Sequence, residues 1–210
     1  MSDEVLGSVA TYYAARLREH GETARGVDWN SEDSQRLRFL KLLELCRADT
    51  TAYSLLDYGC GYGALLDHLA VLGRTGRYTG YDVAPEMVAA AQGRHAARDG
   101  ATFTGSDATL APHDYVLASG IFNVKLETPA AAWHDHVLRT LDRLNALARR
   151  GFAFNLLSLY SDPGLRREKL YYGDPRELFD HCKRLYSPRV ALLHDYPLYE
   201  FTILVRREDP

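Results

Sequence analysis

Residues 54–69, SLLDYGCGYGALLDHL, decide the fold, because an apolar run leads into three glycines at alternate positions and a helical pattern follows at once. The three glycines are Gly59, Gly61 and Gly63. Small residues at the end of a strand let the backbone approach a ligand closely, and the following helix presents free N–H groups and the positive end of its dipole. The stretch therefore predicts a strand, a turn and a helix that together bind a nucleotide-like ligand.

The composition restricts the class of protein. The 210 residues are 46% hydrophobic, which suits a single domain over residues 1–210. The 28 acidic residues outnumber 21 arginines and four lysines, so the chain lacks the basic excess typical of nucleic-acid-binding proteins. No apolar run is long enough to cross a bilayer, and the first residues lack the pattern of a secretion signal. We expect a cytoplasmic monomer or homodimer with no nucleic-acid or membrane partner.

The cysteines indicate neither a disulfide framework nor a metal site. Cys46, Cys60 and Cys182 are odd in number and far apart in the sequence. Disulfide-stabilised domains and zinc sites instead show paired cysteines at short, regular spacings. We therefore predict no bound metal.

Apolar runs alternate with helical patterns through most of the chain, which predicts right-handed strand–helix–strand units and a parallel sheet. The expected strands are 52–59, 76–83, 101–107, 114–120, 151–159, 189–196 and 199–207, and the expected helices are 5–21, 31–46, 63–73, 84–100, 129–148 and 173–185. Only Pro197 and Leu198 separate the last two strands, so these must be antiparallel neighbours. The prediction is an α/β fold with helices on both faces of the sheet.

Three aspartates follow three successive predicted strands and discriminate among ligands. Asp57, just before the glycines, would repel a pyrophosphate but can pair with an ammonium group. Asp82 ends the second strand, where a carboxylate accepts hydrogen bonds from ribose hydroxyls. Asp107, after the third, can accept from the exocyclic amine of adenine. A helix cap for Asp57, a surface turn for Asp82 and an Asx turn for Asp107 are the alternatives. Ammonium, ribose and adenine without phosphate describe S-adenosylmethionine.

The stretch LLDYGCGYG (residues 55–63), followed by GYDVAPEM (residues 80–87), resembles motifs one and two of the class I S-adenosylmethionine-dependent methyltransferases, in particular bacterial small-molecule enzymes. The resemblance covers roughly residues 50–207 and implies a Rossmann-like sheet of seven strands with an antiparallel last strand. It also implies that residues 1–48 form a helical cap over the cofactor and acceptor, and that residues 49–210 form the core.

By this resemblance, S-adenosylmethionine contacts residues at the ends of the first four strands. The expected cofactor residues there are Asp57, Tyr58, Gly59, Gly61, Asp82, Val83, Asp107, Ala108 and Ser119. From the N-terminal region we add Trp29, as a cover over the cofactor, and Arg38, as a partner of the methionine carboxylate. A hydrophobic staple for Trp29 and an exposed position for Arg38 are the alternatives.

Two other functions compete with methyl transfer. Gly59, Gly61 and Ala64 also satisfy the glycine pattern of nicotinamide-binding folds, so an NAD(P)-dependent oxidoreductase is one alternative. A non-catalytic subunit that only binds the cofactor is the other.

The acceptor is expected to be a small molecule, such as a natural product or a sugar or glycan precursor, methylated on oxygen or nitrogen. The stretch Ile121-Phe122-Asn123-Val124 lacks the proline pair of enzymes that methylate DNA bases. Much of the catalysis can come from alignment, and a base is needed only for a protonated acceptor.

Candidate acceptor-site residues come from loops expected at the carboxyl edge of the sheet. Asn123, Lys125 and His194 are the candidates for catalysis, and Tyr13, Trp29, Asn123, Tyr172, His194 and Tyr196 are the candidates for substrate binding. Simple loop, surface or packing roles are the alternatives for each. His134 and His136 do not share a helix face, so they are not expected to form a metal pair. We interpret them as surface residues; a position at the pocket mouth for one of them is the alternative.

Overall fold

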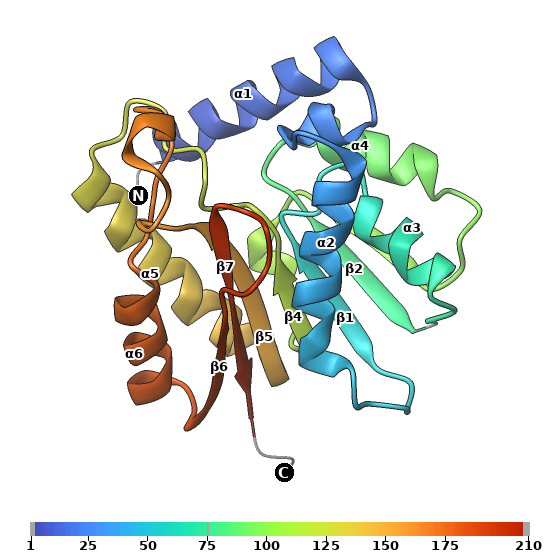
Figure 1. Ribbon diagram of the computed structural model, residues 1–210. Helices are drawn as coiled ribbons and strands as arrows, with labels where there is room; N and C mark the ends of the chain where they lie inside the picture. The colour runs from blue at the N-terminus through green and yellow to red at the C-terminus, as the bar shows by residue number, and fades with distance from the viewer. Residues whose placement is uncertain (1–2, 75, 208–210) are drawn as a thin grey trace.

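Seven strands form one sheet in the order β3-β2-β1-β4-β5-β7-β6 (Figure 1). The computed structural model describes residues 3–74 and 76–207. The strands are β1 Ser54–Tyr58, β2 Arg77–Tyr81, β3 Ala101–Thr104, β4 His113–Ala118, β5 Ala148–Leu157, β6 Arg189–Leu193 and β7 Glu200–Arg206. Strands β1 to β5 run parallel, and β7 is antiparallel to both β5 and β6. The predicted seven-stranded sheet with an antiparallel last strand is confirmed.

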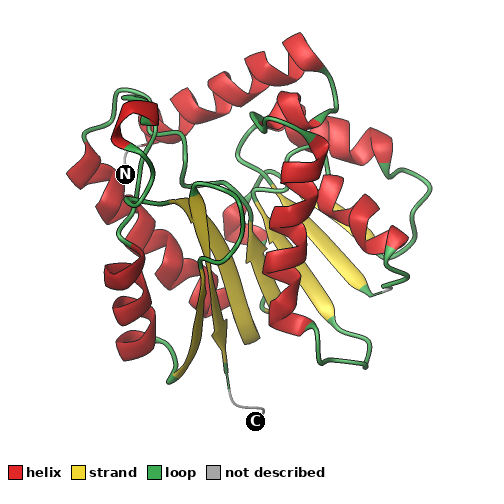
Figure 2. Ribbon diagram, in the orientation of Figure 1, coloured by secondary structure: helices red, strands yellow, loops and turns green. Residues whose placement is uncertain are grey.

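Six α-helices surround the sheet within the described part of the chain (Figure 2). They are α1 Asp3–His20, α2 Glu32–Leu43, α3 Ala64–Val71, α4 Pro85–Arg94, α5 Ala130–Leu147 and α6 Pro175–Leu185, with 3-10 turns η1 Ala24–Val27, η2 Glu44–Cys46, η3 Asp107–Thr109 and η4 Pro163–Leu165. Ser31 caps α2 through a capping box, and Asp174 with Pro175 begins α6.

The core has two parts, one on each face of the sheet. Leu55 of β1 packs with α2 and α3, whereas its neighbour Leu56 packs with α5 and α6. Val116 and Leu117 of β4 divide in the same way, because successive side chains of a strand point to opposite faces. All four are nearly or completely buried, as expected for central strands covered on both sides.

The described part of the N-terminal region, residues 3–48, does not form a single cap, because its two helices pack in different places. Helix α1 crosses above the carboxyl edge of the sheet, and it contacts η1 and α4 (Figure 1). Helix α2 instead packs on the sheet against β5 and β7, because Phe39, Leu42 and Leu43 form a buried apolar face. The cap therefore consists of α1 and η1, and α2 belongs to the helical layer.

The connection between β6 and β7 differs from the expected pattern. The chain leaves β6 at Leu193, so that 194–199 form a turn longer than expected and His194 and Tyr196 lie outside the strand. The β3–β4 link at 105–112, where the sequence predicts no helix, contains only the turn η3.

A buried ion pair joins α2 to β7. Arg38 Nε lies 2.7 Å from Glu200 Oε1, and the two side chains are 7% and 0% exposed. Burial raises the pKa of Glu200, and the Arg38 guanidinium opposes this shift. A buried charge without its partner is strongly destabilising, so each member depends on the other.

We predict that Arg38→Ala lowers the free energy of unfolding by about 3–5 kcal/mol, because it leaves Glu200 buried and uncompensated. Urea denaturation at pH 7 measures this loss. The double variant Arg38→Met/Glu200→Leu, which removes both charges and keeps apolar volume, should recover most of the stability. A single variant as stable as the wild type would show that this pair does not hold α2 on the sheet.

Candidate cofactor and acceptor site

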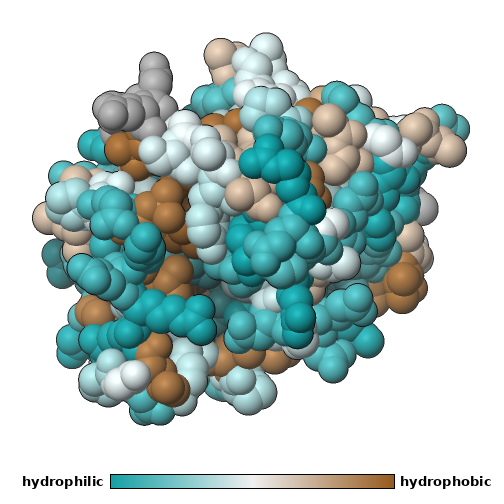
Figure 3. All heavy atoms as spheres, turned by 90° about the horizontal axis from the view of Figure 1, so that it is seen from above, coloured by the Kyte–Doolittle hydropathy of each residue, from teal (hydrophilic) through white to brown (hydrophobic). Residues whose placement is uncertain are grey.

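A cavity of about 150 Å³ lies at the carboxyl ends of β1, β2 and β4, beneath α1. Its lining comes from α1, the η1 loop, α2, the glycine turn, the ends of β2 and β4, and α5. The lining residues are Leu6, Val9, Tyr13, Val27, Trp29, Gln35, Phe39, Asp57, Tyr58, Gly59, Cys60, Gly61, Tyr62, Ala64, Tyr81, Asp82, Val83, Met87, Ser119, Gly120, Ile121, Trp133, His136 and Thr140. On the outer surface of this edge, apolar side chains are scattered among hydrophilic ones (Figure 3).

The glycine turn requires its glycines. Gly59, Gly61 and Gly63 have φ values of +85°, +54° and +86°, a region that favours glycine. A Cβ on Gly59 would lie 2.2 Å from Ile121 Cγ2, and one on Gly61 would lie 2.9 Å from Val27 Cγ1. The turn therefore forms a floor on which the backbone itself faces the cavity.

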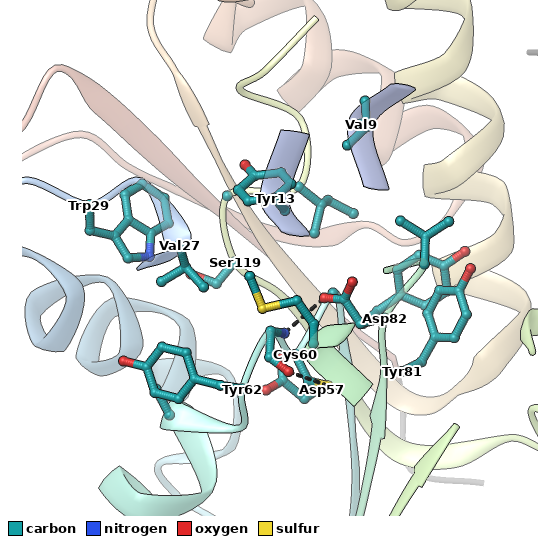
Figure 4. Close-up of a pocket in the computed structure, with 18 of the residues that line it drawn as sticks. Val9, Tyr13, Val27, Trp29, Asp57, Cys60, Tyr62, Tyr81, Asp82 and Ser119 are labelled. Carbon is teal, nitrogen blue, oxygen red and sulfur yellow. Dashed lines mark hydrogen bonds between the residues drawn. The ribbon is translucent and has the colours of Figure 1, made fainter. Parts of the chain in front are cut away.

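Asp57 lies in this floor and lacks a cationic partner (Figure 4). Its side chain is nearly buried, and Tyr78 OH donates a 2.6 Å hydrogen bond to Oδ2. Within the described residues Asp57 forms no ion pair. Burial is the main cause that raises the pKa of Asp57 to about 7. The negative charge of Asp82 raises this pKa further, and the hydrogen bond from Tyr78 lowers it. A buried carboxylate of this kind fits a cationic ligand group such as an ammonium.

Asp82 connects the glycine turn to α4. Its Oδ2 accepts from Gly61 N at 2.8 Å, and its Oδ1 accepts from Ala84 N at 2.9 Å. Burial raises the pKa of Asp82, although these two backbone hydrogen bonds counteract the shift. Each carboxylate oxygen can accept a second hydrogen bond, so Asp82 can still bind a diol such as ribose.

The end of β4 forms the wall beside Trp29. The Oγ atom of Ser119 is buried without a hydrogen-bond partner in the described structure, which is a place for a polar ligand atom. Gly120 has φ +74°, and a Cβ there would lie 2.4 Å from the Trp29 indole. The guanidinium carbon of Arg38 lies over the face of that indole, 3.9 Å from the ring centre. The aromatic ring of Trp29 is thus held between Arg38 and Gly120 at the cavity wall.

Three of the expected cofactor residues lie elsewhere. Arg38 does not line the cavity, because its guanidinium is used by Glu200 and Trp29. Asp107 lies behind Tyr58, which donates a 3.0 Å hydrogen bond to it, and Arg143 pairs with the carboxylate at 3.0 Å. Ala108 is likewise outside the lining. These three residues therefore lie outside the cavity lining, and their roles in cofactor binding stay predictions.

The loop residues predicted for catalysis lie outside the cavity. Two of them form hydrogen bonds with other parts of the chain, and the third is exposed. Asn123 Oδ1 accepts from Leu157 N at 3.2 Å and ties the β4 loop to β5. Lys125 Nζ donates to Leu126 O, and His194 is exposed in the β6–β7 turn. None of the three lines the cavity.

Two tyrosines predicted for substrate binding are also away from the cavity. Tyr196 OH forms a 2.8 Å hydrogen bond with Thr202 Oγ1, and Tyr172 OH accepts from Arg167 N at 3.0 Å. Tyr13 and Trp29 are the predicted substrate residues that do line the cavity (Figure 4).

Helix α5 contributes three side chains to the cavity. His136 lines the cavity together with Trp133 and Thr140, so the pocket position, and not the surface position, is the one that it occupies. The spacings of three and four residues place these side chains on one helix face, and this was the available signal. His134 instead contacts Glu177 Oε1 at 3.2 Å.

In the part of the chain that is described, no three His, Cys, Asp or Glu side chains cluster in a way that could hold a metal ion. None of the described helices is long and apolar enough to span a membrane.

The fold and the site define a cofactor-binding Rossmann-like protein, and comparisons with known proteins identify its family. Residues 56–151 match the family model described as "Methyltransferase domain". The chain is 56% identical over 155 residues to the protein named "Putative methyltransferase Rv1506c" of Mycobacterium tuberculosis, over 74% of this chain and 93% of that protein. The chain belongs to this methyltransferase family, and its fold is that of the class I S-adenosylmethionine-dependent methyltransferases. This assignment favours methyl transfer over the oxidoreductase alternative.

Solved structures share the fold at low sequence identity. Magnesium protoporphyrin IX methyltransferase from Synechocystis PCC 6803, with bound S-adenosylhomocysteine, is similar with a TM-score of 0.67 and 17% identity, over 97% of this chain and 99% of that chain. The N-methyltransferase NodS from Bradyrhizobium japonicum WM9, also with S-adenosylhomocysteine, has a TM-score of 0.65 and 16% identity, over 95% of this chain and 98% of that chain.

The raised pKa of Asp57 predicts a specific pH dependence of stability. Between about pH 4 and pH 7 the unfolded chain has released the Asp57 proton and the folded protein has not, so this residue makes stability fall as pH rises. The loss is complete above about pH 7.

We therefore predict a pH-dependent difference between the unfolding free energies of Asp57→Asn and wild type. This difference, variant minus wild type, should be about 2–4 kcal/mol larger at pH 8 than at pH 4.5. Urea unfolding of both proteins without cofactor at the two pH values measures this difference of differences. Tyr78→Phe is the matched control, because it removes the hydrogen bond and keeps the carboxylate. A mutant-to-wild-type difference that does not change with pH would contradict the assignment.

Proposed function

We propose that the protein transfers a methyl group from S-adenosylmethionine to oxygen or nitrogen of a small molecule, such as a natural product or a sugar or glycan precursor. The observation that carries this proposal is the buried carboxylate of Asp57, which lines the cavity and has no cationic partner among the described residues. The unpartnered Ser119 Oγ belongs to the lining of the same cavity. Both groups suit the amino-acid end of this cofactor.

The chemistry of the lining supports a small organic acceptor. The walls are mostly apolar and aromatic, and neither lysine nor arginine lines the cavity among the described residues. The charged side chains there are the carboxylates Asp57 and Asp82. Such a lining favours a neutral or cationic reacting group, such as a hydroxyl or an amine, over a carboxylate or phosphate.

Proteins of similar structure include a methyltransferase for magnesium protoporphyrin IX, an N-methyltransferase and a bifunctional kinase-methyltransferase. The shared fold therefore does not select between oxygen and nitrogen, and the choice depends on side chains near Tyr13 and Trp29.

The residues of the chain bind and orient the cofactor and shield the reacting groups from water. Bound S-adenosylmethionine supplies an electrophilic methyl group on its sulfonium. Asp57 and Asp82 fix two separated groups of the ligand, and the glycine turn allows the backbone close to it. Tyr13 and Trp29 cover the cavity from α1 and the η1 loop and exclude water. Alignment of this kind can supply ~7–11 kcal/mol of the barrier reduction in favourable cases.

Calorimetry tests the cofactor part of this proposal. The wild type should bind S-adenosylhomocysteine and not NAD, and Asp82→Ala should weaken binding by ~1–3 kcal/mol because two charge-assisted hydrogen bonds are lost. Asp107→Asn is the matched control, since Asp107 lies outside the cavity, and it should keep the wild-type affinity. Binding of NAD alone would overturn the proposal.

Labelled methyl transfer tests the acceptor part. Paired alcohols and amines on the same apolar skeleton should show transfer from methyl-labelled S-adenosylmethionine to at least one member. Tight binding of the cofactor with no transfer to any acceptor would instead support a non-catalytic binding subunit.

A further inference from the structure

Glu200 of β7 is linked to the cavity wall although it does not line the cavity. Its side chain is 0% exposed and lies outside the lining that contains Trp29 and Gly120. Two lines of contact lead from its Oε1 atom to these two wall residues. One line passes through Arg38 of α2, and the other passes through Asn155 of β5. The wall is therefore connected to α2, β5 and β7.

The first line fixes the indole of Trp29. Arg38 Nε lies 2.7 Å from Glu200 Oε1, and the guanidinium carbon lies over the indole face, 3.9 Å from the ring centre. A cation over an indole is attracted to the ring, more strongly where it is withdrawn from water, and the Arg38 side chain is 7% exposed. Because Glu200 holds the guanidinium, it also sets the position of the indole that stacks on it.

The second line fixes the backbone of Gly120. Asn155 is 0% exposed, its Nδ2 lies 3.5 Å from Glu200 Oε1, and its Oδ1 accepts a 2.7 Å hydrogen bond from Gly120 N. A carboxylate accepts hydrogen bonds and does not donate them, so Glu200 turns the NH2 group of this amide toward itself. The amide oxygen then faces Gly120, whose φ of +74° favours glycine.

The two lines meet where Trp29 touches Gly120. A Cβ on Gly120 would lie 2.4 Å from the indole, so glycine lets the indole pack this closely. The contacts thus form a closed network, the Glu200 network, which runs from Glu200 through Arg38, Trp29, Gly120 and Asn155 back to Glu200. Displacing one member breaks contacts on both of its sides, so each member is held in place by two others.

Stability alone does not account for the charges in this network. Glu200 Oε2 and Arg38 Nη1 are buried without a hydrogen-bond partner in the described structure. Unpaired buried polar atoms lower stability, and apolar residues of similar volume often replace a buried ion pair without loss. A costly arrangement of this kind next to a ligand cavity is typical of a functional role.

We propose that Glu200 is a positioning residue that sets the Trp29–Gly120 wall through Arg38 and Asn155. On the basis of the proposed function, this wall lines the cavity in which S-adenosylmethionine and its acceptor meet. A wall that is fixed before the ligands arrive lowers the ordering cost of binding. Glu200 thus acts on ligand binding from β7 without touching the ligands.

The variant Arg38→Met/Glu200→Leu separates positioning from stability. It removes both charges and keeps apolar volume, so urea denaturation should show most of the wild-type stability. Without the guanidinium and the carboxylate, Trp29 and the amide of Asn155 lose their orientation. Calorimetry should therefore show S-adenosylhomocysteine binding weakened by about 10-fold. In the protein without ligand, acrylamide should quench the fluorescence of Trp29 more strongly than in wild type.

Thr202→Val is the matched control on the same strand. It removes a buried hydrogen bond between Thr202 Oγ1 and Tyr196 OH and leaves the Glu200 network intact. This variant should lose stability and keep the wild-type affinity and quenching. Trp29→Phe gives the remaining fluorescence of Trp133, which is 1% exposed.

Two results would overturn the inference. One is wild-type affinity and quenching in Arg38→Met/Glu200→Leu, and the other is an equal change of both quantities in Thr202→Val. If wild type did not bind S-adenosylhomocysteine, the proposed function would fail, whereas quenching in the protein without ligand would still test whether Glu200 positions Trp29.

Discussion

The structure of this site depends on one uncompensated charge. Asp57 is nearly buried at the end of β1, and its partner among the described side chains is the hydroxyl of Tyr78 rather than a cation. Burial raises the pKa of Asp57 to about 7. Ionisation of Asp57 at neutral pH therefore lowers the free energy of unfolding of the ligand-free protein. A ligand that brings a positive charge would remove this cost, which is why we propose that Asp57 contributes to both the affinity and the specificity for the cofactor.

The neighbouring elements are arranged around that carboxylate. The glycine turn places backbone beside it, and Asp82 holds the turn through Gly61 N. Trp29 lies against Gly120 and is backed by Arg38, whose pair with Glu200 ties α2 to β7. The N-terminal region thus contributes in two ways: α1 and η1 cover the cavity, and α2 supports its wall from the sheet side.

The fold and the cofactor floor were predictable because their signals are local. Strand–helix alternation and the order Asp57, Gly59, Gly61 lie within short stretches of sequence, and the chemistry of each residue is visible there. Ion pairs between residues that are distant in the sequence could not be predicted from such short stretches. The partner of Arg38 is on β7, and Asp107 is paired with Arg143 on α5. His136 lines the cavity with Trp133 and Thr140, and the sequence signal for this was their shared helix face rather than the type of any one residue.

Proton release on cofactor binding tests the central claim most directly. At pH 6 Asp57 is mostly protonated in the free protein, and pairing with an ammonium requires its ionised form. Calorimetry of S-adenosylhomocysteine binding in two buffers of different ionisation enthalpy counts the protons released. The account predicts release of about one proton at pH 6, falling toward zero at pH 8, and none at pH 6 in Asp57→Asn. Binding at pH 6 without proton release, or with equal release in Asp57→Asn, would contradict it.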